Sequence, residues 1–181
     1  MPGQHFVSGL YQSHAKHLPD DEYGRALDSL VIATVDVMLM KPTGEILLAK
    51  RTFEPVMGVF ETPGGRMRPG ESFAQTAARN TKRELGIVVA PGRFRYIGSN
   101  SYVWAVRPMP PQDHGSHTIS TAMVVQLTDQ EASAIKLNAE NSETVWISPV
   151  EVIVRAEEFK GAVVVQICKD YLITKVIKSV S

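Results

Sequence analysis

The stretch PGGRMRPGESFAQTAARNTKRELGI, residues 63–87, joins a glycine turn to a helix and decides the fold. Ser72 and Gln75 have the spacing of a capping box, in which a serine side chain begins a helix and the residue three positions later closes the turn. Gly86 stands where a left-handed residue commonly ends a helix. The stretch therefore predicts a loop followed by a helix over residues 73–85.

Side chains that handle phosphate and metal ions gather in this stretch. Its paired glycines let the backbone approach a ligand closely. On the predicted helix, Asn80 and Glu84 share one face, and Arg79 and Arg83 share another, because residues four positions apart are neighbours. The stretch is therefore a candidate site for a phosphorylated ligand and a metal ion.

The spacing resembles that of the Nudix box, at Gly65, Glu71, Arg79, Glu84, Gly86 and Ile87. In that family the box is a loop–helix–loop that binds Mg²⁺ and a diphosphate. Its usual form has glutamates at the positions that Asn80 and Arg83 hold here. The resemblance implies an α+β fold in which a mixed β-sheet is sandwiched between helices.

One Nudix branch, the GDP-mannose mannosyl hydrolases, also lacks those glutamates, and residues 30–150 resemble it. The segment KRTFEPVMGVFETPGGR resembles a stretch of that branch and has the same fifteen-residue step from Arg51 to Arg66. Asp36 lies fifteen residues before Arg51 and falls on a functional position of the branch. The resemblance implies a Mg²⁺-dependent hydrolase of nucleoside diphosphate sugars, of the GDP-mannose or GDP-glucose type, that releases sugar and nucleoside diphosphate.

The metal ligands that the resemblance implies are the Gly64 carbonyl, Glu84 and Glu140. Mg²⁺ prefers hard oxygen ligands of this kind, and Mn²⁺ is an alternative. Because carboxylates are missing from two positions of the box, we expect one metal ion rather than a cluster.

The implied substrate contacts come from Arg51, Arg66 and Arg79, whose planar forks match phosphate oxygens. By resemblance, Arg51 and Arg66 contact the departing diphosphate, and Asp36 recognises the sugar or orders the site. Arg79 has an equal claim to an ion-pair role on the helix, and Glu71 holds the loop together. Structural ion pairs to Glu54 or Glu61 are the alternative for Arg51 and Arg66.

The sequence leaves the general base open. The branch has a histidine five residues before a strand tryptophan, and counting back from Trp146 gives Asn141. An amide does not accept a proton at neutral pH, whereas carboxylates and histidines do. The candidates that remain are Glu140, Glu143, His114 and His117.

Two other functions stay open at this point. One is a Nudix pyrophosphatase that attacks phosphorus, which Asn80 and Arg83 disfavour because that chemistry generally uses the missing glutamates. The other is a nucleotide-sugar-binding module with little turnover, which Asn141 favours.

The chain has 181 residues, enough for one Nudix domain over residues 28–181 after an N-terminal arm over residues 1–27. The arm is expected to be irregular or one short helix, packed on a partner subunit, and the resemblance suggests a homodimer. Nineteen basic residues balance nineteen acidic ones, so neither nucleic acid nor a membrane is an expected partner. Cys168 is the single cysteine, which fits a cytoplasmic protein.

The remaining elements follow from β-branched runs, turn residues and helical spacing. Residues 107–117, rich in proline and histidine, are expected to form a loop too polar to pack. The pattern predicts strands at residues 30–40, 45–51, 93–106, 119–127 and 144–149, and helices at residues 150–157 and 161–178.

Overall fold

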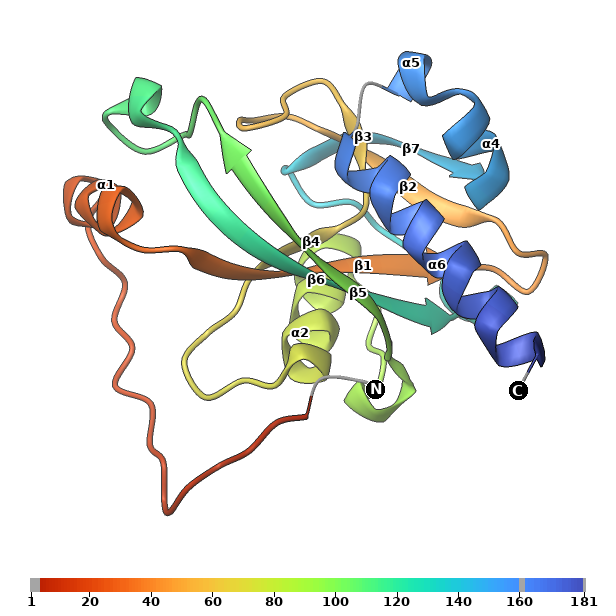
Figure 1. The fold of residues 1–181 in the computed structure, drawn as a ribbon, viewed down its shortest axis with the longest axis horizontal. Coiled ribbons are helices and arrows are strands. Elements are labelled where there is room, and N and C mark those ends of the chain that lie inside the picture. The colour runs from red at the N-terminus through yellow and green to blue at the C-terminus, as the bar shows by residue number, and fades with distance from the viewer. Residues whose placement is uncertain (1–3, 160–161, 181) are drawn as a thin grey trace.

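The computed structural model describes residues 4–159 and 162–180 and has a mixed sheet with helices on both faces (Figure 1). The strands are β1 (Ile32–Met40), β2 (Ile46–Arg51), β3 (Phe60–Glu61), β4 (Gly64–Arg66), β5 (Arg95–Trp104), β6 (Ser116–Gln126) and β7 (Asn141–Ile147). The helices are α1 (Asp20–Ser29), α2 (Phe73–Leu85), α3 (Asp129–Ser133), α4 (Pro149–Val154), α5 (Ala156–Phe159) and α6 (Ala162–Val180), with 3₁₀ turns at Pro91–Arg93 and Gln112–His114.

The sheet is organised around β1, which is parallel to β6 and antiparallel to β2 and β4. The strand order is β3-β2-β1-β6-β5, and β7 pairs with β2 outside this path. Parallel and antiparallel pairs in one sheet, with helices on both faces, confirm the predicted α+β fold. The pairing of β4 with β1 places Gly64 opposite Asp36, so two predicted site residues meet at the register of the sheet.

The sheet separates two apolar clusters, because successive side chains of a strand point to opposite faces. From β1, Val37 and Leu39 pack in the cluster of α2, whereas Met38 and Met40 pack in the cluster of α4 and α6. Figure 1 shows α2 behind the sheet and α6 in front of it. Both faces are therefore covered where the sheet is deepest, and the polar site lies toward one end.

Helix α2 has the predicted bounds and caps. The Ser72 hydroxyl accepts from the Gln75 amide, and the Gln75 side chain accepts from the Ser72 amide, so both halves of the capping box form. Gly86 ends the helix in the left-handed conformation at a φ of 71°. The loop before α2 therefore meets the helix at a fixed angle.

Three predictions differ from the structure. Residues 107–117 pack only in part, because Arg107 and Gly115 are buried and β6 already begins at Ser116, whereas residues 110–114 are exposed as predicted. Strand β7 begins at Asn141 rather than at residue 144, because its pairing with β2 continues past a register shift between Ala49 and Arg51. The helix predicted at residues 150–157 is two short helices, interrupted where Arg155 leaves helical geometry.

The N-terminal region contains the short helix that was one of the two expectations, and α1 crosses the predicted boundary at residue 27. Residues 1–3 of the predicted arm and residue 161 of the last predicted helix lie outside the described residues. Within the described ranges, no helix combines the length and the apolar character that a membrane span needs.

Candidate active site

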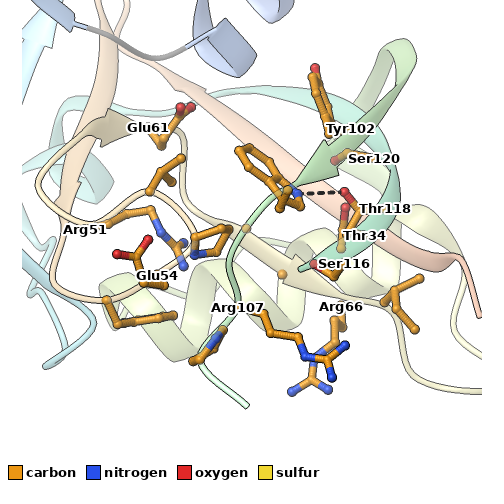
Figure 2. Close-up of a pocket in the computed structure, with 18 of the residues that line it drawn as sticks. Thr34, Arg51, Glu54, Glu61, Arg66, Tyr102, Arg107, Ser116, Thr118 and Ser120 are labelled. Carbon is orange, nitrogen blue, oxygen red and sulfur yellow. Dashed lines mark hydrogen bonds between the residues drawn. The ribbon is translucent and has the colours of Figure 1, made fainter. Parts of the chain in front are cut away.

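A cavity of about 360 Å³ lies beside the glycine turn (Figure 2). Its walls come from α1, the middle of β1, the loop that follows β2, the turn at β4 and the facing ends of β5 and β6. This volume is in the range of pockets that hold small molecules and cofactors. The cavity therefore has room for a small-molecule ligand.

The cavity receives Arg51 and Arg66 from different sides, as Figure 2 shows. The Arg51 guanidinium lies 4.4 Å from the ring centroid of Phe53, and the Arg66 guanidinium lies 4.1 Å from that of Tyr23. Within the described residues, neither arginine forms an ion pair with a carboxylate. Each guanidinium group is thus positioned by an aromatic ring, and its positive charge is available to a ligand.

A buried acidic corner occupies one wall of the cavity. The Ser120 hydroxyl donates to Asp36, and burial raises the pKa of the Asp36 carboxyl to about 6. Burial, with the nearby Asp36 charge adding to it, raises the pKa of Glu61 to about 8. Two interacting carboxyls of this kind titrate as a pair, so near neutral pH the pair carries about one proton and one negative charge.

Several buried polar atoms that line the cavity have no hydrogen-bond partner in the described part of the chain. They include Arg51 Nε and Thr62 Oγ1, whereas Glu61 and the Tyr102 hydroxyl lie near the Val164 amide and the Asn100 side chain without a hydrogen bond of normal geometry. Buried polar atoms in native proteins are nearly always paired, and each unpaired atom needs an explanation. These atoms mark the wall of the cavity as polar.

The three predicted metal ligands do come together, but around a guanidinium group. Arg83 donates to the Gly64 carbonyl at 3.2 Å and to Glu84 at 2.7 Å through Nη2, and to Glu140 at 2.8 Å through Nη1. Glu84 is 2 % exposed, and burial raises its pKa to about 7, although the Arg83 charge works the other way. With Arg83 in this position, the oxygen set does not fit a divalent cation.

Arg79 is fully engaged in holding the loop and does not line the cavity. Its Nε and Nη2 donate to Glu71 at 2.6 and 2.7 Å, Nη2 also donates to the Arg66 carbonyl, and Nη1 donates to Asn80. Burial acts to raise the pKa of Glu71, but the hydrogen bonds, led by that from Arg79, lower it to about 2. The structure therefore favours the ion-pair role of Arg79 over substrate contact.

The candidates for the general base lie in different surroundings. Glu140 lines the cavity but is paired with Arg83. Glu143 pairs with Lys50 at the surface, and neither residue lines the cavity. His114 contacts Asp28, and His117 contacts Ser101, both outside the cavity lining.

Helix α1 and the 107–117 loop close one side of the cavity. Arg107 donates to Asp28 at 2.7 Å and to the carbonyls of Met109 and Gly115. At Gly24 the helix passes so close to the loop that an added Cβ would lie 2.0 Å from the Pro110 carbonyl oxygen. The buried Arg107 charge therefore fastens α1 to the loop, and α1 brings Tyr23 to the site.

Among the residues that shape this cavity, sequence reasoning missed Tyr23 and Arg107 and named Glu61 only as an alternative ion-pair partner. Glu61 lies between two quoted motif residues, but a lone glutamate in a strand gives no sign of its burial. An aromatic residue in the acidic N-terminal segment and an arginine before a proline-rich loop are ordinary surface patterns. Their roles depend on contacts between distant parts of the chain.

The profile of the NUDIX domain family matches residues 31–166. The low-salt glycan biosynthesis protein Agl8 of Haloferax volcanii is 25% identical over 136 residues, covering 73% of this chain and 80% of that protein. Among solved structures, the MutT protein of Methanosarcina mazei is similar with a TM-score of 0.64 at 21% identity, covering 80% of this chain and 95% of that chain.

A second solved structure, a C. elegans Ap4A hydrolase, is similar with a TM-score of 0.59 at 17% identity, covering 81% of this chain and 98% of that chain. At such identities the two structures establish the fold. The family profile, in contrast, spans most of the chain, including β1, the glycine turn and α2. The chain therefore belongs to the Nudix hydrolase family.

Proposed function

We propose that the chain hydrolyses a nucleoside diphosphate sugar of the GDP-mannose or GDP-glucose type, releasing sugar and nucleoside diphosphate. The observation that carries this proposal is the pair of guanidinium groups, Arg51 and Arg66, which line the cavity and have no carboxylate ion pair within the described residues. Their planar forks match the oxygens of a diphosphate. The H. volcanii relative is named for glycan biosynthesis, which supports a sugar-containing ligand.

The diphosphate would lie between Arg51 and Arg66. Both line the cavity, both rest on an aromatic ring, and neither has a carboxylate partner within the described residues. Guanidinium groups bind phosphate oxygens bidentately and stabilise the negative charge that develops as the nucleoside diphosphate leaves. Arg79, which Glu71 already holds, would act only by fixing the loop.

The acidic corner would face the sugar. With a pKa of about 6, Asp36 is largely ionised at neutral pH and would take a proton from the attacking water. With a pKa of about 8, Glu61 is largely protonated there and would donate a hydrogen bond to a sugar oxygen. Asp36 is thus the proposed base in place of the four candidates named from the sequence, of which only Glu140 lines the cavity, where Arg83 holds it.

Nudix hydrolases generally use divalent metals such as Mg²⁺, but Arg83 fills the place between the Gly64 carbonyl, Glu84 and Glu140, the three ligands that the resemblance implies. A bound divalent ion would supply positive charge against a diphosphate. Because Arg83 lies among these oxygens, the proposed reaction does not depend on a metal ion.

The expected homodimer stays a prediction, which sedimentation analysis tests.

The test is a screen of nucleotide sugars in ¹⁸O-labelled water, with EDTA in one series and Mg²⁺ in another. Label in the released sugar supports attack at the anomeric carbon, whereas label in phosphate shows the pyrophosphatase reaction. Asp36→Asn is expected to bind the substrate and lose most turnover. Arg68→Ala is the matched control, since it removes an exposed arginine of the same loop.

The second candidate is a binding module with little turnover. The observation that favours it is Asn141, which stands where the resemblance predicts a histidine and leaves its amide nitrogen without a partner in the described chain. Calorimetry with GDP-mannose, paired with a turnover assay over hours, separates the two functions. Saturable binding without product supports the module and contradicts the hydrolase.

A further inference from the structure

We propose that the guanidinium group of Arg83 replaces the divalent cation of this site, so that the chain binds its diphosphate ligand without a metal ion. The three oxygen ligands expected for Mg²⁺ are all hydrogen-bonded to one arginine side chain of the same helix. Arg83 therefore serves as a permanent cation covalently attached to the site. Because it takes a diphosphate as ligand, this assignment rests on the proposed function.

The contacts place Arg83 at the centre of the oxygen set. Its Nη2 lies 2.7 Å from Glu84 and 3.2 Å from the Gly64 carbonyl, and its Nη1 lies 2.8 Å from Glu140. Glu140 is 57 residues away along the chain, so the packing of a separate loop completes the set. Three groups from three segments thus converge on one guanidinium.

The glycine turn leaves space for this arrangement. A Cβ added at Gly65 would lie 3.1 Å from Arg83 Nη2, so the guanidinium would have to shift by a few tenths of an ångström. Gly64 is more restricted, because its added Cβ would lie 2.6 Å from both the Asp36 carboxyl and the Val35 carbonyl. Glycine at position 64 therefore lets the turn pass β1, and glycine at position 65 leaves the guanidinium in its place.

The outer side of Arg83 faces the cavity. The side chain is 42 % exposed and is part of the cavity lining, whereas Glu84 behind it is buried. Arginine has five N–H donors, and the three bonds above use three of them. Two donors are left to bind phosphate oxygens, beside the guanidinium groups of Arg51 and Arg66.

A divalent ion and Arg83 compete for one place. Mg²⁺ binds oxygens at about 2.0–2.1 Å, much closer than a hydrogen-bonded guanidinium does, and it would lie against a like charge. Metal binding would therefore require the Arg83 side chain to swing out of the oxygen set. Removing Arg83 would, in contrast, leave three oxygens arranged for a cation.

The direct test measures Mn²⁺ binding to the full chain without nucleotide, by electron paramagnetic resonance and calorimetry. In the wild type and in the Arg68→Ala control we expect no saturable Mn²⁺ site with a Kd below about 1 mM, because a competing cation already fills the oxygen site. Arg83→Gln and Arg83→Ala are each expected to gain one site at least about tenfold tighter. If one of the two variants does not fold, the other still gives the answer, and thermal melting shows whether each variant is folded.

Wild-type protein that binds one Mn²⁺ as tightly as Arg83→Gln would overturn the assignment. A second arm measures GDP binding in EDTA and in Mg²⁺. We expect equal affinity in the wild type, about tenfold weaker binding for Arg83→Gln in EDTA, and recovery with Mg²⁺. If GDP does not bind to any variant while the Mn²⁺ results hold, the proposed function fails and the replacement of the cation by Arg83 stands.

Discussion

Arg79 and Arg83 lie one turn apart on α2, yet they do different things. Arg79 is enclosed by the loop before the helix, where Glu71, Asn80 and a backbone carbonyl accept its hydrogen bonds. Arg83 borders the cavity and holds the oxygens expected to bind a metal ion. Two arginines four residues apart on one helix can therefore differ in role, because Arg79 stabilises the loop whereas Arg83 borders the cavity.

The largest expected effect concerns the cavity rather than the loop. Arg51→Ala should lower turnover of the nucleotide sugar by about 100-fold or more, because the leaving diphosphate loses a preorganised donor. The free energy of unfolding should fall by only about 1 kcal/mol, since Arg51 has no ion pair within the described residues and its guanidinium rests on the Phe53 ring. Steady-state kinetics and urea unfolding measure the two quantities, and an unchanged kcat would contradict the assignment.

The next effect tests the loop. Arg79→Ala should lower the free energy of unfolding by about 2–3 kcal/mol at pH 7, because it leaves the partly buried Glu71 without its charged partner. Glu71 has a lowered pKa in the folded chain, so its stabilising contribution is present above about pH 4.5 and is lost as pH falls toward 2.

Urea unfolding of Arg79→Ala and wild type at pH 7 and pH 3 tests this directly. The difference between the two proteins should shrink at the lower pH. Equal differences at both values would mean that Arg79 stabilises the fold by packing rather than by its charge.

Glu61→Gln should raise the free energy of unfolding at high pH, whereas Arg79→Ala should lower it at pH 7. The folded chain holds the Glu61 proton up to about pH 8, so wild-type stability falls as pH rises from about 4.5 to 8. A neutral amide removes this dependence and should make the variant about 1–2 kcal/mol more stable than wild type at pH 9. Unfolding across pH 5–9 measures it, and Glu71→Gln, which should destabilise at neutral pH, is the matched comparison.

The smallest effect concerns the start of α2. Ser72→Ala removes the N-cap acceptor of the Gln75 amide and should cost about 1 kcal/mol of stability. Because the cap lies at the opposite end of α2 from Arg83, GDP binding should not change. Thermal melting and calorimetry give the two values, and weakened GDP binding would show that the two ends are coupled.

Local signals predicted the parts of the fold that local chemistry decides. Ser72, Gln75 and Gly86 act within α2 itself, so the sequence gives the helix its bounds. The β-branched run of β1 and the turn after it likewise form a hairpin with β2. The family spacing named Asp36 and Gly64 separately, and only the strand register of β4 on β1 shows that they lie opposite each other.

Long-range contacts explain what the sequence did not predict. The position of Arg83 depends on Glu140, 57 residues later, and the burial of Arg107 depends on Asp28, 79 residues earlier. The raised pKa of Glu61 depends on burial in a cavity that α1 and β5 help to close. Charge patterns in sequence cannot reveal such contacts, because the same residues are equally common on exposed surfaces.

The Asp28–Arg107 pair has a practical consequence for anyone who produces this protein. A fragment trimmed to residues 31–166, the part shared with its relatives, would keep the sheet but lose α1. Arg107 would then be buried without its counter-ion, and Arg66 would lose the aromatic platform of Tyr23. Ligand screens on such a shortened protein would sample an unfinished pocket, so the first helix belongs in every expression vector.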